Sequence, residues 1–92
     1  MEWARNKKGL TSCRVCGLEQ RFFPWGEDGQ TPTFDICSCC GVEFGYEDAT
    51  RLAVQNYREA WLTHGAKWWR RDEMPENWCL EGQLKNVPPD FI

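Results

Sequence analysis

The chain has 92 residues, a formal net charge of −3 and a hydrophobic content of 41%. This length predicts a single domain, residues 1–92, with a marginal core, because small chains bury a smaller share of their surface. The acidic balance argues against a general nucleic-acid binder, which needs a basic surface. No stretch approaches the ~20 apolar residues of a membrane span, so we expect no membrane insertion.

Residues 1–12 are predicted to form a flexible polar arm. They contain no apolar run of the kind that forms the core of a signal peptide, so we expect a cytoplasmic location. Cytoplasmic thiols are kept reduced. The six cysteines of the chain therefore point to metal binding rather than to a disulfide framework.

Two C-x-x-C-G elements carry the clearest chemical signal. We name residues 13–17 knuckle 1 and residues 37–41 knuckle 2. The spacing lets both sulfurs of a knuckle face one ion, and four thiolates close a tetrahedral shell around Zn²⁺. We predict one structural Zn²⁺ with four ligands: Cys13, Cys16, Cys37 and Cys40.

The segment between and after the knuckles is predicted to be β-structure. Residues 18–25 are rich in aromatic side chains, as strands often are, and residues 26–29 contain an Asp-Gly step that favours a tight turn. Residues 31–36 suit the returning strand, and the alternation over residues 42–46 predicts a short third strand. Residues 13–47 are thus predicted to form a zinc ribbon.

Residues 48–87 are predicted to be a helical extension. Asp48 is expected to cap a helix over residues 49–64, which Gly65 ends. Pro75 suits the first turn of a second helix, and a pair of prolines ends that helix near residue 87. The predicted fold class is α+β: a small zinc ribbon, made of a β-hairpin and a short third strand, with C-terminal helices packed on it.

A family resemblance accompanies these patterns. Residues 13–48, with the turn at residues 24–29 and the run from residue 37 to 48, resemble small bacterial cysteine-rich CPCC-type zinc-ribbon proteins. Such proteins often have proline after the first cysteine of a knuckle, where this chain has Arg14 and Ser38. The resemblance implies cytosolic metal binding and implies no established biochemical activity.

A macromolecular interaction, most simply with a protein, is the function that we expect. Tryptophan and arginine are enriched at binding hot spots, and the expected contact residues are Trp68, Trp69, Arg70 and Arg71. The simpler interpretation is that most of the six tryptophans cover the ribbon and join it to the helices, which leaves these four as possible contact residues. The oligomeric state is not predicted by any feature of the sequence.

Two other functions are open at this stage. Paired C-x-x-C-G elements also resemble rubredoxin, so a rubredoxin-like electron carrier with iron in place of zinc is one alternative. A nucleic-acid-binding zinc ribbon is another, since aromatic and arginine side chains suit single strands. An enzyme is not expected, because a closed four-cysteine shell has no coordination position for water, and His64 is the sole histidine. Cys39 and Cys79 are interpreted as non-ligands.

Overall fold

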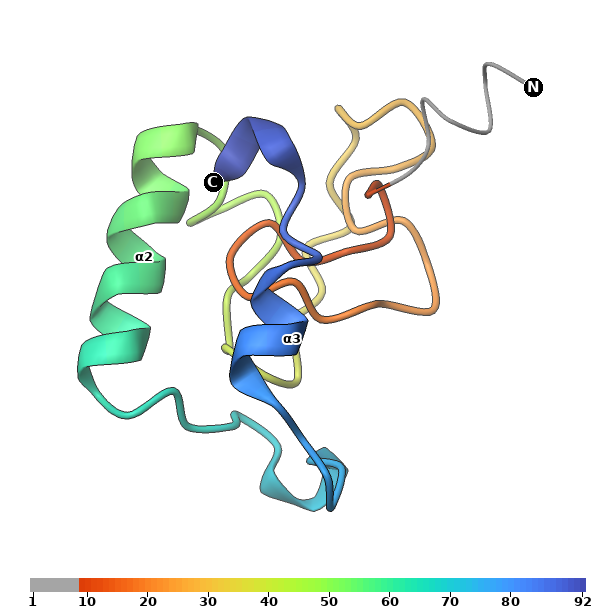
Figure 1. Ribbon diagram of the computed structural model, residues 1–92. Coiled ribbons are helices and arrows are strands. Elements are labelled where there is room, and N and C mark those ends of the chain that lie inside the picture. Colours follow the sequence, from red (N-terminus) through yellow and green to blue (C-terminus); the bar gives the residue numbers. More distant parts are fainter. Residues whose placement is uncertain (1–8) are drawn as a thin grey trace.

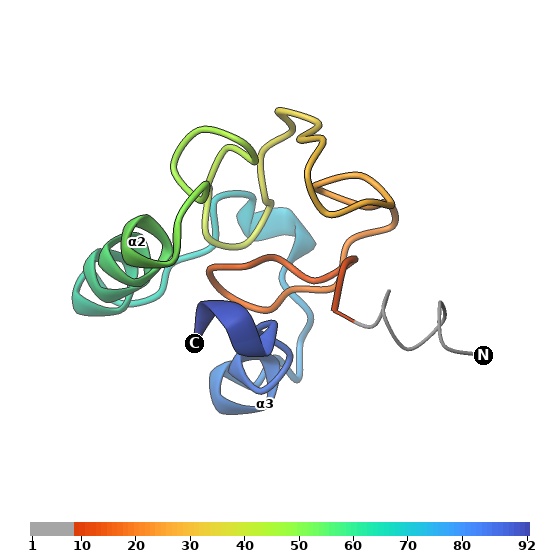
Figure 2. The ribbon, with the colours of Figure 1, turned by 90° about the horizontal axis from the view of Figure 1, so that it is seen from above.

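The computed structural model describes residues 9–92, so most of the predicted arm, with Trp3, lies outside the described residues. The elements in chain order are helix α2 (Arg51–Thr63), the 3-10 turn η1 (Arg71–Glu73), helix α3 (Leu80–Leu84) and the 3-10 turn η2 (Pro89–Phe91). In Figures 1 and 2, α2 and α3 lie along two sides of the loops that precede residue 50. The cysteine-rich loops therefore sit at the centre.

The predicted α+β ribbon is wrong. Residues 9–92 contain no β-strand, and the extended pairing is limited to two isolated antiparallel bridges, Ser12 with Glu19 and Ile36 with Glu43. Each bridge lies at the base of one knuckle and joins the chain that enters it to the chain that leaves it. The chain between the knuckles thus contributes no hairpin.

Local backbone geometry explains the missing hairpin. Residues 23–29 form successive turns, in which Gly26 N–H donates to the Phe23 carbonyl and Gly29 N–H donates to the Gly26 carbonyl. Phe34 has a φ of +64°, in the left-handed region, which breaks the extended path of the predicted returning strand. The third predicted strand ends at a turn in which Tyr46 N–H donates to the Glu43 carbonyl.

Helix α2 matches its prediction closely, apart from its cap. Thr50 is the N-cap, and its hydroxyl accepts from the Ala53 backbone N–H at 3.1 Å, so the expected cap Asp48 is wrong. His64 is the C-cap, and Gly65 follows with a φ of +97°, as predicted for the end of the helix. The buried face of α2 carries Val54 and Trp61.

The second predicted helix is much shorter than expected. Helix α3 covers only Leu80–Leu84, and the Cys79 sulfur accepts the backbone N–H of Gly82 at its start. The turn η2 then packs against α2. No helix within residues 9–92 has the length and apolar character to cross a membrane.

The core is built around the knuckles. The cysteines of both knuckles, Val15, Val42 and Phe44 are fully or almost fully buried. Val54 and Trp61 of α2 and Trp68 from the following loop belong to the same cluster. A metal centre in this position would stand inside the core rather than at its edge.

Candidate metal centre

The two knuckles have the same backbone geometry. In knuckle 1, Cys13 N–H donates to the Leu18 carbonyl and Gly17 N–H donates to the Cys13 carbonyl, each at 2.9 Å. In knuckle 2, Cys37 and Gly41 donate in the same way, again at 2.9 Å. Gly17 and Gly41 have φ values of +83° and +80°, a conformation that glycine adopts without a Cβ penalty. The C-x-x-C-G pattern therefore builds two equivalent loops.

The two loops bring four sulfurs together, as the spacing predicted. Cys13 Sγ lies 3.7 Å from Cys40 Sγ, and Cys16 Sγ lies 3.7 Å from Cys37 Sγ, so each close pair joins one knuckle to the other. All four sulfurs lie within 4.8 Å of one another. Thiolates about 2.3 Å from a shared ion are about 3.8 Å apart in a regular tetrahedron. These four cysteines could hold one metal ion.

Burial and mutual hydrogen bonding perturb the thiols of this cluster. Contacts with the neighbouring thiols, that of Cys13 first, lower the pKa of Cys37 and raise the pKa of Cys16. Burial raises the pKa of Cys40. Close packing of the sulfurs thus shifts the pKa values of neighbouring thiols in opposite directions. A bound cation would favour the deprotonated, thiolate form of all four cysteines.

Two glutamine amides support the cluster. Gln20 Nε2 donates to Cys37 Sγ at 3.6 Å. Gln83 Nε2 lies 3.2 Å from the Cys16 carbonyl oxygen and 3.3 Å from Cys39 Sγ. Such donors offset the negative charge that a thiolate site concentrates. No sequence pattern marked either glutamine.

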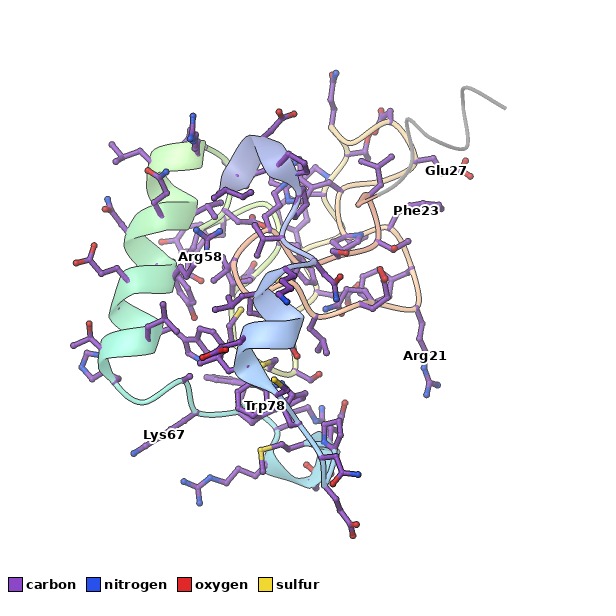
Figure 3. All side chains as sticks on the ribbon, in the orientation of Figure 1. Arg21, Phe23, Glu27, Arg58, Lys67 and Trp78 are labelled. Atoms are coloured by element: carbon purple, nitrogen blue, oxygen red, sulfur yellow. The ribbon has the colours of Figure 1, made fainter. Side chains whose placement is uncertain are left out.

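Helix α2 contacts both knuckles through adjacent residues. Tyr57 Oη donates to the Cys40 carbonyl at 3.0 Å. Arg58 donates to the carbonyls of Val15 at 2.6 Å and Arg14 at 2.9 Å. Figure 3 shows Arg58 directed from α2 toward the centre of the molecule. Burial lowers the pKa of Arg58 and the nearby thiols oppose this shift, so a positive charge stands beside the cysteines.

Asp48 has a role that the sequence analysis missed. It is fully buried, and its carboxylate accepts from the Gly45 backbone N–H at 2.7 Å and from Trp25 Nε1 at 2.9 Å. Arg14 lies between the Trp25 ring, at 3.9 Å, and the Phe91 ring, at 4.2 Å. Burial lowers the pKa of Arg14, against the opposing effect of Asp48. This cluster anchors the loop after knuckle 2.

The predicted contact residues are not all exposed: Trp68 is buried, whereas Trp69, Arg70 and Arg71 are exposed. Trp68 is 7% exposed and meets Trp78 edge to face at 5.6 Å, whereas Trp69 is 63% exposed. Trp68 Nε1 is buried without a hydrogen-bond partner among the described residues. Arg70 pairs with Glu73 at 2.9 Å on the surface. Trp68 is therefore a core residue, whereas Trp69 is not.

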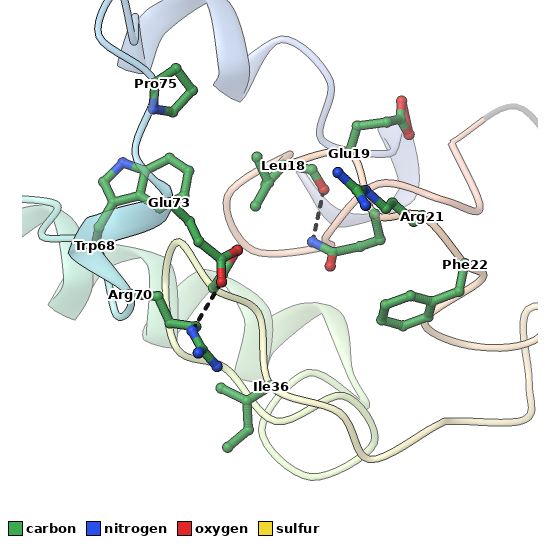
Figure 4. Close-up of a pocket in the computed structure, with 11 residues that line it drawn as sticks. Leu18, Glu19, Arg21, Phe22, Ile36, Trp68, Arg70, Glu73 and Pro75 are labelled. Atoms are coloured by element: carbon green, nitrogen blue, oxygen red, sulfur yellow. Dashed lines mark hydrogen bonds and ion pairs between the residues drawn. The ribbon is translucent and has the colours of Figure 1, made fainter.

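A cavity of about 750 Å³ lies beside knuckle 2. Residues 18–22 form one wall, and the other is formed by Trp68, Arg70, Glu73 and Pro75. Figure 4 shows the Arg70–Glu73 pair on this second wall. Ile36 and Ser38 complete its lining. Its mixture of acidic, basic and apolar side chains favours no ligand class.

The remaining singled-out residues are not members of the four-sulfur group. Cys39 is buried beside this group, and Cys79 is exposed in a different part of the chain. Neither belongs to the group of sulfurs that could share an ion. His64 Nδ1 lies 2.7 Å from the Ala60 carbonyl oxygen at the end of α2.

Comparison with known proteins finds two relatives in Bacillus subtilis (strain 168). The uncharacterised protein YozI is 31% identical over 83 residues, which cover 73% of this chain and 69% of YozI. The uncharacterised protein YoaQ is 32% identical over 90 residues, which cover 82% of this chain and 71% of YoaQ. This chain belongs to their family. No family model and no solved structure matches the chain. Because both relatives are uncharacterised, they assign no activity to this small bacterial family.

Proposed function

We propose that the chain is a structural metal-binding protein whose four knuckle cysteines hold one Zn²⁺. The observation that carries this proposal is the sulfur geometry. Two crossed pairs at 3.7 Å match the separation of about 3.8 Å that a tetrahedral Zn–S₄ shell requires. The zinc chemistry implied by CPCC-type proteins agrees with this shell, although the ribbon hairpin of that fold is absent from residues 9–92.

A structural role is supported by what the ligands hold in place. The knuckles lie in the core cluster, and the side chains of Tyr57, Arg58 and Gln83 are bonded to their carbonyls. Four thiolates leave no coordination position for a substrate or water. We therefore propose a role without catalysis, in which the ion fixes the relative positions of α2, α3 and the loops.

Iron is the alternative that this geometry admits. Four thiolates also form the shell of rubredoxin-like centres, and iron–sulfur chemistry uses the same ligands. We propose zinc because the site is tied to the packing of the whole core. A red protein with iron in equimolar amount would instead establish the electron-carrier alternative.

Elemental analysis of the purified chain tests the proposal. We expect about one zinc per chain. The double variant Cys37→Ser, Cys40→Ser should lose it, because two thiolates cannot close the shell. Cys79→Ser is the matched control, since Cys79 is exposed and outside the cluster. Full metal content in the double variant would contradict the assignment.

We also propose a protein partner in a cytoplasmic setting. The exposed Trp69 supports an interaction, and the net charge of −3 favours a protein over nucleic acid. None of the six cysteines is joined in a disulfide, which suits a reducing compartment. Affinity capture with the parent chain and with Trp69→Ser tests this. A partner retained equally by both would exclude Trp69 as a contact.

A further inference from the structure

Cys40 differs from the other three cysteines of the cluster in its access to solvent. Cys13, Cys16 and Cys37 have no exposed surface, while Cys40 is 6% exposed. Cys40 also lines a cavity of about 250 Å³, which we name the access cavity. Cys40 is therefore the cysteine of this cluster that retains some exposed surface and borders a cavity.

The wall of the access cavity is a stripe of helix α2. It consists of Tyr57, Ala60 and Trp61 of α2 and the C-cap His64, which recur at the spacing of one helix face. Ala60 is exposed and has the smallest side chain of the lining, so it covers less of the cavity than its aromatic neighbours do. Aromatic rings on both sides of Ala60 make the lining predominantly apolar.

Other contacts close the remaining approaches to the cluster. The Gln20 amide covers the sulfur of Cys37. The carbonyl of Cys16 is bonded to Gln83, and a Cβ at Gly17 would lie only 2.2 Å from the Gln83 carbonyl oxygen. Knuckle 1 is thus sealed by the segment around α3, while knuckle 2 faces the access cavity.

We propose that Cys40 is the exchange ligand of the metal site, at which small thiols or dithiols enter and replace a protein sulfur. This rests on the proposed metal-binding function. In the exchange, the incoming sulfur bonds to the ion and the bond to Cys40 Sγ breaks. The proton of the incoming thiol passes to Cys40 Sγ, and no electron is transferred. The apolar lining admits small uncharged thiols more readily than charged chelators.

Filling the access cavity tests this exchange route. Metal-loaded chains in a Cys79→Ser background are mixed with excess dithiothreitol and a chromogenic zinc indicator. Ala60→Leu should slow zinc release several-fold, because the added side chain covers Cys40. Glu59→Leu is the matched control, since Glu59 is an exposed neighbour on α2 that does not line the cavity. Equal release from both variants and the parent would overturn the proposal.

Alkylation provides an independent measurement. Limiting N-ethylmaleimide followed by peptide mass mapping should label Cys40 before the other three cluster cysteines, and Ala60→Leu should suppress that label. Preferential labelling of another cluster cysteine would refute the route. Metal content is counted first: fewer than one ion per chain would defeat the metal-binding function, whereas full content with unchanged rates would defeat only the role of Cys40.

Discussion

Replacement of Gly17 by alanine tests whether residues 83–87 pack directly against knuckle 1. Gly17 has a φ of +83°, and a Cβ built on it would lie 2.2 Å from the Gln83 carbonyl oxygen and 3.1 Å from the Val87 amide nitrogen. Gly65 has a similar φ of +97°, but its Cβ would meet nothing closer than Lys67 Cε at 3.8 Å. Both positions have a positive φ, but only at Gly17, which is buried, would the added Cβ meet backbone atoms at close range.

The expected losses of stability follow from this difference. An alanine in the left-handed region costs roughly 1–2 kcal/mol, so Gly65→Ala should lose about that amount. Gly17→Ala must also displace Gln83, whose side-chain amide contacts the Cys16 carbonyl and Cys39 Sγ. Two hydrogen bonds at about 1 kcal/mol each raise the expected loss to about 3–4 kcal/mol. The extra 2 kcal/mol or so corresponds to a melting temperature lower by roughly 8–16 °C.

Thermal melts of both metal-loaded variants, followed by circular dichroism, measure this difference. Metal content is checked before each melt, so that a lost ion is not mistaken for a lost contact. Equal melting temperatures for Gly17→Ala and Gly65→Ala would refute the reasoning. Such a result would mean that residues 83–87 are not held against knuckle 1 in solution.

Three further outcomes are expected. Cys39→Ser and Cys79→Ser should each keep about one metal ion by elemental analysis, since neither sulfur belongs to the cluster; loss from Cys39→Ser would show that the register of knuckle 2 is wrong. Burial, and then the charges of Cys40 and Glu47, raise the pKa of Tyr57 above its unfolded value of about 10. Because the neutral phenol is favoured in the folded state, this stabilisation is complete below pH ~10 and is lost as pH rises further. In urea titrations above pH ~10, the free energy of unfolding of the parent should therefore fall more steeply with pH than that of Tyr57→Phe. Equal slopes for the two proteins would contradict the raised pKa of Tyr57. Chelation should shift tryptophan emission to the red and reduce the helical signal, whereas a native spectrum after complete metal removal would show that the helices pack without the ion.

The sequence predicts well those features that depend on neighbours along the chain. The C-x-x-C-G pattern predicts the positions of the two sulfurs in each knuckle, because each turn is closed by backbone hydrogen bonds between residues at most five apart. Helix α2 is likewise visible in its periodicity, and Gly65 marks its end. The prediction of residues 49–64 differs from the observed Arg51–Thr63 mainly because Asp48 serves another purpose.

The hairpin prediction failed because β-propensity does not reveal where backbone groups find their partners. Thr31 N–H donates to the Trp25 carbonyl and Thr33 N–H donates to the Pro24 carbonyl, so these groups are used in a compact loop. Pro24 is also fully buried there. The aromatic and β-branched residues of this segment pack around turns instead of forming a ladder.

The length of α3 depends on contacts that no local pattern contains. Trp78 Nε1 donates to Gln83 Oε1 at 2.8 Å, and the amide of the same glutamine reaches knuckle 1. Gly82 lies within the helix, where glycine costs about 1 kcal/mol relative to alanine. A short helix held by long-range bonds is therefore favoured over the longer helix that its flanking prolines suggest.

The same long-range bonds explain why a metal at the knuckles would influence residues far along the chain. Beyond Tyr57 and Arg58 of α2, the loop after that helix also bonds to knuckle 2: Trp69 N–H donates to the Cys39 carbonyl at 2.9 Å, and Arg70 N–H donates to the Ser38 carbonyl at 2.8 Å. Each bond needs a knuckle carbonyl to point outward, and that orientation depends on the sulfurs pointing inward. Structural zinc contributes about 10–16 kcal/mol in small modules, against a net stability of about 5–15 kcal/mol for a folded domain. An ion that fixes the sulfurs thus also fixes the carbonyls on which α2, α3 and the loop between them depend.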